Sequence, residues 1–210
     1  MNVASAAGRV LVVDTGMGNV RSVLRALERA GASPEHTKDP ERIASAERLV
    51  VPGQGHFQDC ARAFQGELGG AVRAFLSTGR PYLGICLGMQ ILFESSEEAP
   101  GALGLGVFPG VVRRFGHDMR SPNGERLKVP HMGWSEVTSA HPFLPGSPWL
   151  YFVHSYHVVP SDASLVAATA VYGGTFCAAI ARENVFACQF HPEKSQHAGA
   201  ALLSRFVVSR

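Results

Sequence analysis

The stretch PYLGICLGMQ, residues 81–90, places one cysteine between two glycines at the end of a short apolar run. Its segment GICLG, residues 84–88, has the spacing of a nucleophile elbow, a sharp turn between a strand and a helix. The glycines let the two backbones approach closely, where side chains would collide. The stretch therefore predicts a strand over 81–85 and a helix over 87–94, whose N-terminus favours a Cys86 thiolate.

Segments upstream of this turn alternate between apolar runs and amphipathic stretches. RVLVVD (9–14) and RLVVPG (48–53) indicate buried strands, whereas VRSVLRALERAGA (20–32) and ELGGAVRAFLSTG (67–79) indicate helices that end near a glycine. Strands that alternate with helices form parallel sheets covered on both faces. The first half of the chain therefore predicts an α/β fold with a mostly parallel central sheet.

The second half of the chain has a different residue pattern. After Glu97 the segments are short, β-prone and separated by Gly, Pro, Asn and Asp, which predicts antiparallel strands added to the central sheet. SQHAGAALLSRFVVSR (195–210) predicts a closing amphipathic helix. Because there is no internal repeat or low-complexity linker, we expect a single domain over residues 9–210, preceded by disordered residues 1–8.

Composition excludes several classes of protein. The 210 residues are 46% hydrophobic and 17% charged, and the formal net charge of +2 is too small to require a nucleic acid partner. Neither a secretory signal nor an apolar run long enough to span a membrane is visible, so we expect a cytoplasmic protein. The four cysteines contain no C-x-x-C pair, which predicts reduced thiols and no zinc ribbon.

Cofactor and metal sites are not predicted either. DTGMGNVRS lacks the third glycine of a dinucleotide-binding loop, because Arg21 stands there. His154 and His157 are three residues apart in an expected strand, so their side chains should point to opposite faces rather than converge on a metal ion.

A candidate general base follows a second apolar strand. VFACQFHPEKS (185–195) ends that strand in His191-Pro192-Glu193, and the proline keeps His191 out of helical conformation. Glu193 can lie on the same side as the imidazole, orient it and stabilise its charged form. These residues with Cys86 predict a Cys-His-Glu triad for acyl transfer.

Acyl transfer also needs hydrogen-bond donors for the oxyanion. The turn supplies the Leu87 N–H, and the glycine-rich PGQG loop (52–55) could supply a second from Gly53 or Gln54. The plain alternative for this loop is an ordinary strand connection. The remaining thiols, Cys60, Cys177 and Cys188, read as structural cysteines of the core.

Three motifs in this order, PGQG, GICLGMQ and FHPEKS, resemble those of the class I (triad-type) glutamine amidotransferases. VVDTGMGNVRSV (12–23), VPHMGWSEV (129–137) and YFVHSYHV (151–158) are similar to the glutaminase subunits of histidine biosynthesis. The resemblance covers nearly the whole chain. It implies a flavodoxin-like fold, hydrolysis of L-glutamine through a cysteinyl thioester, no cofactor, and a heterodimer with a (β/α)₈-barrel cyclase that receives the ammonia.

The resemblance also implies roles for single residues. Cys86 is the nucleophile, His191 the base and Glu193 its orienting partner. The glutamine contacts that it implies are Gln90, Glu98, Gly53 and the backbone near Ser155 and Tyr156. The positions that it implies for the cyclase interface are Asn19, Met132, Trp134, Tyr151 and Lys194.

At three positions the chain departs from the usual family pattern. Thr15 replaces a common tyrosine and Ser135 a common asparagine, which affects details of the expected interface. Gln54 stands where valine is frequent, in a peptide whose flip could complete the oxyanion hole when the partner binds.

Other functions share parts of this pattern. Glutaminases of carbamoyl phosphate, anthranilate or pyridoxal phosphate synthases have the same triad. A stand-alone cysteine peptidase or amidohydrolase would need the elbow and the histidine but neither PHMGW nor HPEKS. A non-catalytic module would lack one member of the triad, and this sequence has all three.

Overall fold

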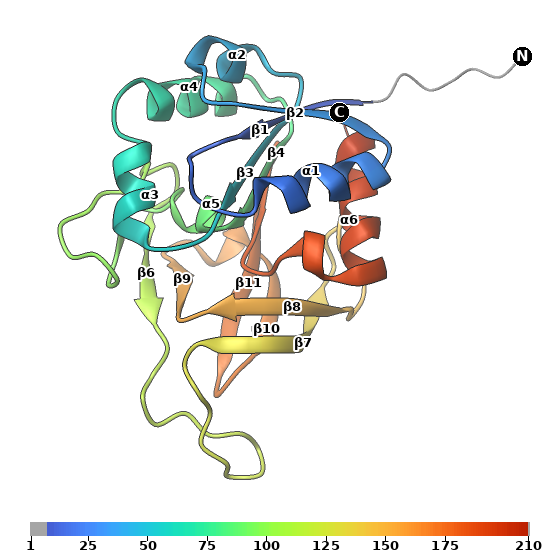
Figure 1. The fold of residues 1–210 in the computed structure, drawn as a ribbon. Helices are drawn as coiled ribbons and strands as arrows, with labels where there is room; N and C mark the ends of the chain where they lie inside the picture. Colours follow the sequence, from blue (N-terminus) through green and yellow to red (C-terminus); the bar gives the residue numbers. More distant parts are fainter. Residues whose placement is uncertain (1–7, 210) are drawn as a thin grey trace, which may run out of the picture.

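The computed structural model of the protein describes residues 8–209 (Figure 1). Of the segment expected to be disordered, residues 1–7 lie outside this range, and Gly8 begins the first strand. A nine-stranded sheet forms the centre, in the order β2-β1-β3-β4-β12-β11-β10-β7-β8. A smaller sheet has the order β5-β6-β9. The predicted α/β class with a mixed central sheet is confirmed.

Five neighbouring strands of the large sheet run parallel. They are β2 (Ala32–Thr37), β1 (Gly8–Val13), β3 (Leu49–Gly53), β4 (Tyr82–Cys86) and β12 (Val185–Cys188). Four of them carry continuous buried apolar residues because both faces of the sheet are covered. Their carboxyl ends meet at one edge, where open α/β sheets bind their ligands.

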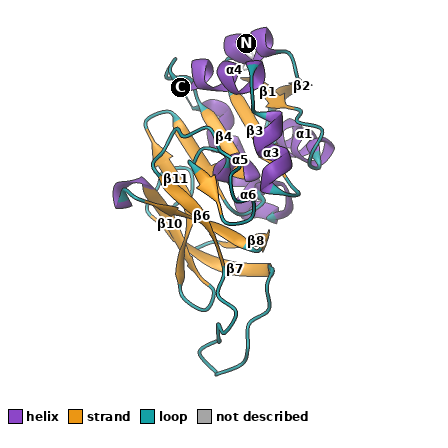
Figure 2. Cartoon of the chain, turned by 90° about the vertical axis from the view of Figure 1, so that its left-hand side faces the viewer, coloured by secondary structure: helices purple, strands orange, loops and turns teal. Residues whose placement is uncertain are grey.

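The other strands are mostly antiparallel, as the short β-prone segments predict. The large sheet continues through β11 (Thr175–Arg182), β10 (Val166–Val171), β7 (His131–Ser139) and β8 (Trp149–His154). The small sheet contains β5 (Ser95–Ser96), β6 (Gly110–Arg114) and β9 (Tyr156–Pro160), and η1 (Ala163–Leu165) precedes β10. The long connection from β6 to β7 extends away from the sheets (Figure 2).

Helices cover both faces of the parallel half. α1 (Val20–Arg29) and α6 (Gln196–Val208) pack on one face with Val10, Val12 and Val50. The opposite face packs Leu11, Val13 and Val51 against a second group of helices. This alternation is the period of two expected of a strand. The second group comprises α2 (Pro40–Ser45), α3 (Phe57–Ala63), α4 (Glu67–Leu76) and α5 (Leu87–Gln90).

Several elements differ from the sequence-based expectation. The short helices α2 and α3, of six and seven residues, were not predicted. β2, of sequence ASPEHT, was not predicted, because it is a polar edge strand that contains a proline. The helix expected over residues 87–94 ends at Gln90. The carbonyl groups of residues 91–94 accept instead from the backbone N–H groups of residues 104–108, so a distant loop replaces the next helical turn.

Within residues 8–209 no helix is long and apolar enough to cross a lipid bilayer.

Candidate active site

Cys86 lies on a strained turn between β4 and α5. Its φ of 54° is in the left-handed region, which non-glycine residues rarely occupy, and its side chain is buried. A Cβ on Gly84 would lie 2.5 Å from the Gly88 carbonyl oxygen, and one on Gly88 would lie 1.8 Å from that of Val51. The expectation that glycine is required at both positions is confirmed, because backbone fills the space.

The backbone after Cys86 is fixed by a buried hydroxyl group. Tyr82 Oη donates a hydrogen bond to the Gly88 carbonyl oxygen at 3.0 Å. Because α5 has only four residues, its dipole is much smaller than that of the predicted longer helix. The helix dipole at Cys86 is therefore weaker than the sequence predicts.

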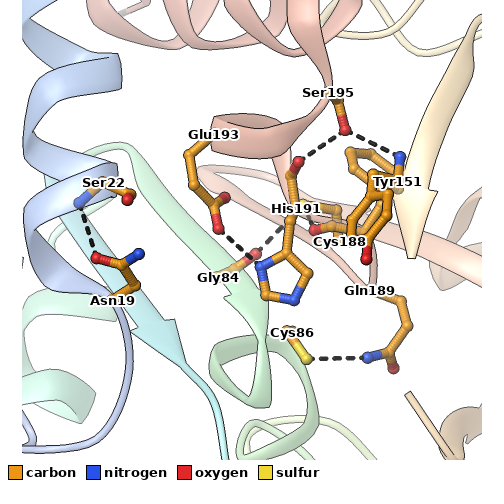
Figure 3. Close-up of polar contacts among 11 residues, drawn as sticks. Asn19, Ser22, Gly84, Cys86, Tyr151, Cys188, Gln189, His191, Glu193 and Ser195 are labelled. Atoms are coloured by element: carbon orange, nitrogen blue, oxygen red, sulfur yellow. Dashed lines mark hydrogen bonds and ion pairs between the residues drawn. The ribbon is translucent and has the colours of Figure 1, made fainter. Parts of the chain in front are cut away.

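His191 and Glu193 lie beside Cys86, at the end of β12 (Figure 3). Nδ1 of His191 is 2.8 Å from Oε1 of Glu193, and both side chains are 1% exposed. The short helix η2 (Pro192–Lys194) turns the chain so that the carboxylate faces the ring. Nε2 of His191 is directed toward Cys86 and makes no hydrogen bond within residues 8–209. The structure thus brings the three predicted triad residues together.

The electrostatics of His191 favour its charged form. Burial lowers the pKa of the imidazole, but the neighbouring Cys86 and Glu193 side chains outweigh burial and raise this pKa to about 10. An imidazolium between a carboxylate and a sulfur atom stabilises a thiolate in turn.

Ser195 and Tyr151 hold the His191 segment against β8. The Ser195 hydroxyl donates to the His191 carbonyl oxygen at 2.7 Å and accepts from the Tyr151 N–H at 3.0 Å. The N–H of His191 donates to the Tyr151 carbonyl oxygen at 3.0 Å. The base is therefore fastened by its backbone as well as by Glu193.

A cavity of about 250 Å³ opens over the cysteine. Gln90, Glu98, Ser155 and Tyr156, the residues expected on the glutamine side, all line it, as do Leu87 and Gln54. Glu98 also accepts from the Phe57 N–H at the start of α3, at 2.8 Å. The cavity is further lined by Cys86, His191, Gly55, Val153 and His154.

The PGQG loop lies against the turn that carries Cys86. Gly53 is paired with Cys86 across β3 and β4, and a Cβ on Gly53 would lie 2.5 Å from the Leu87 Cβ. Gly53 is thus a close-packing position beneath the cavity wall that Gln54 and Gly55 form.

Four of the five residues expected at the partner interface form a cluster next to the site. Met132 is 66% exposed and Trp134 40% exposed. Trp134 meets the Tyr151 ring edge-on at 5.9 Å, and Lys194 Nζ lies 5.9 Å from the centre of that ring. The fifth residue, Asn19, is exposed at the start of α1, where it accepts from the Ser22 N–H at 3.1 Å.

Two residues beside these were not predicted. Trp149 is 59% exposed and lines a hollow with Trp134 next to α6. Gln189 is fully buried, and its Nε2 lies 3.5 Å from the Cys86 sulfur (Figure 3). It stands two positions before His191, so the period of two in a strand is the signal that could have found it.

The prediction that His154 and His157 share one strand and point to opposite faces was wrong. Both rings lie against Phe115, at centroid distances of 5.1 and 4.8 Å. They belong to different strands, β8 and β9, because the chain turns at Ser155 rather than continuing as one strand.

The other cysteines are buried free thiols, and burial raises the pKa of Cys60 and of Cys177 to about 12 and that of Cys188 well above its usual value.

Cys86 on its strained turn, with His191 and Glu193 buried beside it at the carboxyl edge of a parallel sheet, has the arrangement expected of a site for acyl transfer to sulfur. The family model for class I glutamine amidotransferases matches residues 11–209. The chain therefore belongs to the class I glutamine amidotransferase family, and the resemblance deduced from its motifs is confirmed.

Relatives with known names narrow the comparison to one kind of subunit within this family. The imidazole glycerol phosphate synthase subunit HisH of Syntrophotalea carbinolica is 51% identical over 205 residues, which cover 94% of this chain and 98% of that protein. The subunit of the same name from Thermosynechococcus vestitus is 49% identical over 207 residues, covering 95% and 96%. The chain is thus similar over nearly its whole length to HisH subunits of imidazole glycerol phosphate synthase.

Solved structures share the fold at low sequence identity. A structure described as a glutamine amidotransferase has a TM-score of 0.72 at 21% identity and covers 94% of this chain and 96% of its own. The structure of PurLQS from Thermotoga maritima gives 0.72 at 18% identity, covering 96% and 98%. These likenesses support the fold alone.

Proposed function

We propose that this chain hydrolyses L-glutamine to glutamate and ammonia, and supplies the ammonia to the cyclase subunit of imidazole glycerol phosphate synthase. The observation that carries the proposal is the buried triad beside a small cavity lined by Gln90, Glu98 and Tyr156, in a chain that is 51% identical to a HisH subunit. The cyclase, a (β/α)₈ barrel, would form a heterodimer with it. The product pair would be imidazole glycerol phosphate and aminoimidazole carboxamide ribotide.

The first half-reaction uses the charged forms of the pair. The Cys86 thiolate attacks the carboxamide carbon, a C–S bond forms, and the carbonyl oxygen becomes an oxyanion. The imidazolium of His191 then gives its proton to the nitrogen, and the C–N bond breaks. Ammonia departs, and the acyl group remains on Cys86 as a thioester. The N–H groups of Leu87 and of the Gly53–Gln54 region are the proposed donors to the oxyanion.

The second half-reaction restores the enzyme. Neutral His191 takes a proton from water, which attacks the thioester carbon. The C–S bond breaks to release glutamate and regenerates the thiolate beside an imidazolium. Glu193 orients the ring and stabilises its charge throughout.

We assign the glutamine contacts to the cavity wall. Gln90, Glu98 and the Ser155–Tyr156 segment all line it, and Gln90 Nε2 donates to the Tyr156 carbonyl oxygen at 3.1 Å. Glu98 can accept a hydrogen bond from the substrate ammonium group. Gln90 is held in place by hydrogen bonds from its Nε2 to the Tyr156 carbonyl oxygen and to Gln189 Oε1.

We place the partner on the exposed aromatic cluster of Met132, Trp134, Tyr151 and Lys194, with Asn19 at its edge. Exposed aromatic and methionine side chains are typical of interface anchors. Because Tyr151 is bonded to His191 and Ser195 through its backbone, a partner seated there would contact the support of the base. The four buried free thiols are consistent with the reducing cytoplasm, where we place the reaction.

The test is to mix the purified chain with the purified cyclase, its nucleotide substrate and L-glutamine. We expect glutamate release to rise roughly tenfold or more over the chain alone, the size of a typical coupling between sites. An unrelated (β/α)₈ barrel is the control. Equal stimulation by both barrels, or stimulation only by an anthranilate or pyridoxal phosphate synthase, would assign the chain to another partner. Full activity without any partner would indicate a stand-alone amidohydrolase.

A further inference from the structure

Gln189 is a fully buried amide in contact with the reacting sulfur. Its side chain is 0% exposed, and its Nε2 donates to Cys86 Sγ at 3.5 Å (Figure 3). Its Oε1 accepts from Gln90 Nε2 at 3.0 Å. Burial of an amide is unfavourable unless its polar atoms are bonded, and both ends of this one are.

The hydrogen bonds allow only one orientation of the two amides. The Tyr156 carbonyl oxygen can only accept, and it accepts from Gln90 Nε2 at 3.1 Å and from His154 Nδ1 at 2.8 Å. Gln90 Nε2 is thus a donor that also reaches Gln189 Oε1. Gln189 must therefore turn its NH₂ group toward Cys86.

Strand pairing places this donor on the sulfur. Cys188, the last residue of β12, is paired with Ile85 of β4, so Gln189 follows directly beside Cys86. The N–H of Gln189 donates to the Ala178 carbonyl oxygen at 2.9 Å, which keeps its backbone in the sheet. The amide thus approaches the sulfur from a rigid element.

A hydrogen-bond donor beside the Cys86 sulfur affects how readily the thiol ionises. A hydrogen bond to an ionised acceptor is stronger than one to its neutral form, and more so in a buried site. The amide of Gln189 therefore favours thiolate over thiol. It also restricts rotation of the Cys86 side chain, on which the direction of attack depends.

We propose that Gln189 is a catalytic residue that donates to the Cys86 sulfur, stabilises the thiolate and fixes its rotamer, and that Gln90 is a positioning residue that orients Gln189. This inference rests on the proposed role of Cys86 as the nucleophile. It gives Gln90 a second task besides lining the glutamine cavity. The simpler alternative is that Gln189 only ties β12 to α5.

Thiolate formation can be measured without glutamine or a partner. The full-length chain is alkylated with iodoacetamide over a range of pH, and the rate at Cys86 is followed by peptide mass spectrometry, with Cys86→Ala as the background. Gln189→Met keeps the length and volume of the side chain but removes the donor. We expect the midpoint of the rate profile to rise by about one pH unit, and the rate well below the original midpoint to fall about tenfold.

The matched control is Cys188→Ala, which alters a buried residue one position earlier on the same strand and should leave the midpoint within about 0.3 units. Gln90→Met is the second variant, since it removes the support of Gln189 without touching the sulfur. We expect a smaller rise in the same direction. If a folded Gln189→Met chain keeps the wild-type midpoint, the proposal is wrong. If that chain does not fold, an unchanged midpoint in Gln90→Met overturns it.

Failure of this proposal and failure of the glutaminase assignment give different results. In the complex with the cyclase, Gln189→Met should lower kcat about tenfold while KM for glutamine changes little, because Gln189 does not line the cavity. A shifted alkylation midpoint with no glutamine hydrolysis in the wild type would retain the role of Gln189 and reject the glutaminase. Normal hydrolysis with an unshifted midpoint would do the reverse.

Discussion

Nδ1 of His191 lies 2.8 Å from Oε1 of Glu193, and burial shields the pair from solvent. This contact leaves Nε2 as the ring nitrogen that faces Cys86. A carboxylate two residues from the histidine, held by one turn of helix, therefore fixes the orientation of the imidazole ring.

Removal of the Glu193 charge should change the alkaline side of the pH profile. The imidazolium is the proposed donor to the leaving nitrogen, and Cys86 and Glu193 raise its pKa to about 10 against the effect of burial. In Glu193→Gln we expect the alkaline limb of glutaminase activity to move to lower pH and kcat to fall about 10²-fold. The measurement is the pH-rate profile of the cyclase complex. Glu28→Gln, on the exposed face of α1, is the control. An unmoved alkaline limb would contradict the role of Glu193.

Replacement of Cys86 should separate glutamine hydrolysis from ammonia use. In the cyclase complex Cys86→Ala should lose about 10⁴-fold or more of the glutamine-dependent rate, since the nucleophile is removed. Synthesis from added ammonium salt should continue, because only the cyclase is needed. Cys177→Ala, a buried cysteine of β11, is the control. Retention of most glutamine-dependent activity would exclude Cys86 as the nucleophile.

Two glycine substitutions should have opposite effects on stability. In Gly88→Ala the new Cβ would lie 1.8 Å from a backbone oxygen, so we expect the free energy of unfolding to fall by about 3 kcal/mol or more. Gly70, inside α4, has open space around the added carbon, and Gly70→Ala should raise it by about 0.5–1 kcal/mol. Urea unfolding of both variants tests this, and equal effects would refute the packing argument.

The buried His154 should make the fold sensitive to acid. Burial lowers its pKa to about 3, so as the pH falls below 6.5 the unfolded chain binds a proton that the folded chain excludes. Between pH 7 and 5 this group should remove about 2 kcal/mol of stability. The contribution of His191 to the free energy of unfolding has the opposite pH dependence. Because its pKa is raised in the folded state, this contribution is fully present below pH 6.5 and is lost as the pH rises toward 10.

The effect of His154 is therefore measured as a difference between variants. His154→Gln can keep a donor for the Tyr156 carbonyl oxygen but does not titrate. Its unfolding free energy should fall about 2 kcal/mol less than that of the wild type between pH 7 and 5. His36→Asn, on the exposed edge strand β2, should behave like the wild type. Identical slopes for His154→Gln and the wild type would contradict the prediction.

Truncation of the exposed aromatic cluster should weaken the complex. Trp134→Ala should reduce affinity for the cyclase by about 2 kcal/mol, or roughly 30-fold, as expected for an aromatic anchor. Calorimetric titration measures this, and a thermal melt checks that the variant is folded. Val208→Ala is the control, because that residue is 73% exposed at the end of α6, close to the start of β1 and the opposite sheet edge. Equal affinities of both variants for the cyclase would show that the interface does not include Trp134.

The sequence by itself determined the α/β class, the main strands and helices of the first half, and the local chemistry around Cys86 and His191. These features are readable because their causes are local. Apolar periodicity, the two glycines of GICLG and the proline of HPEKS all act within a few residues.

Only the tertiary structure decided the rest of the site. Gln189 reaches Cys86 because β12 is inserted beside β4, although the two residues are 103 positions apart in the chain. The helix after Cys86 stops at Gln90 because residues 104–108 take its next carbonyl groups. Periodicity can place Gln189 on the same face as His191, but it does not say which strand lies beside β4 or which loop meets the helix end, since those energies depend on which segments the fold brings together.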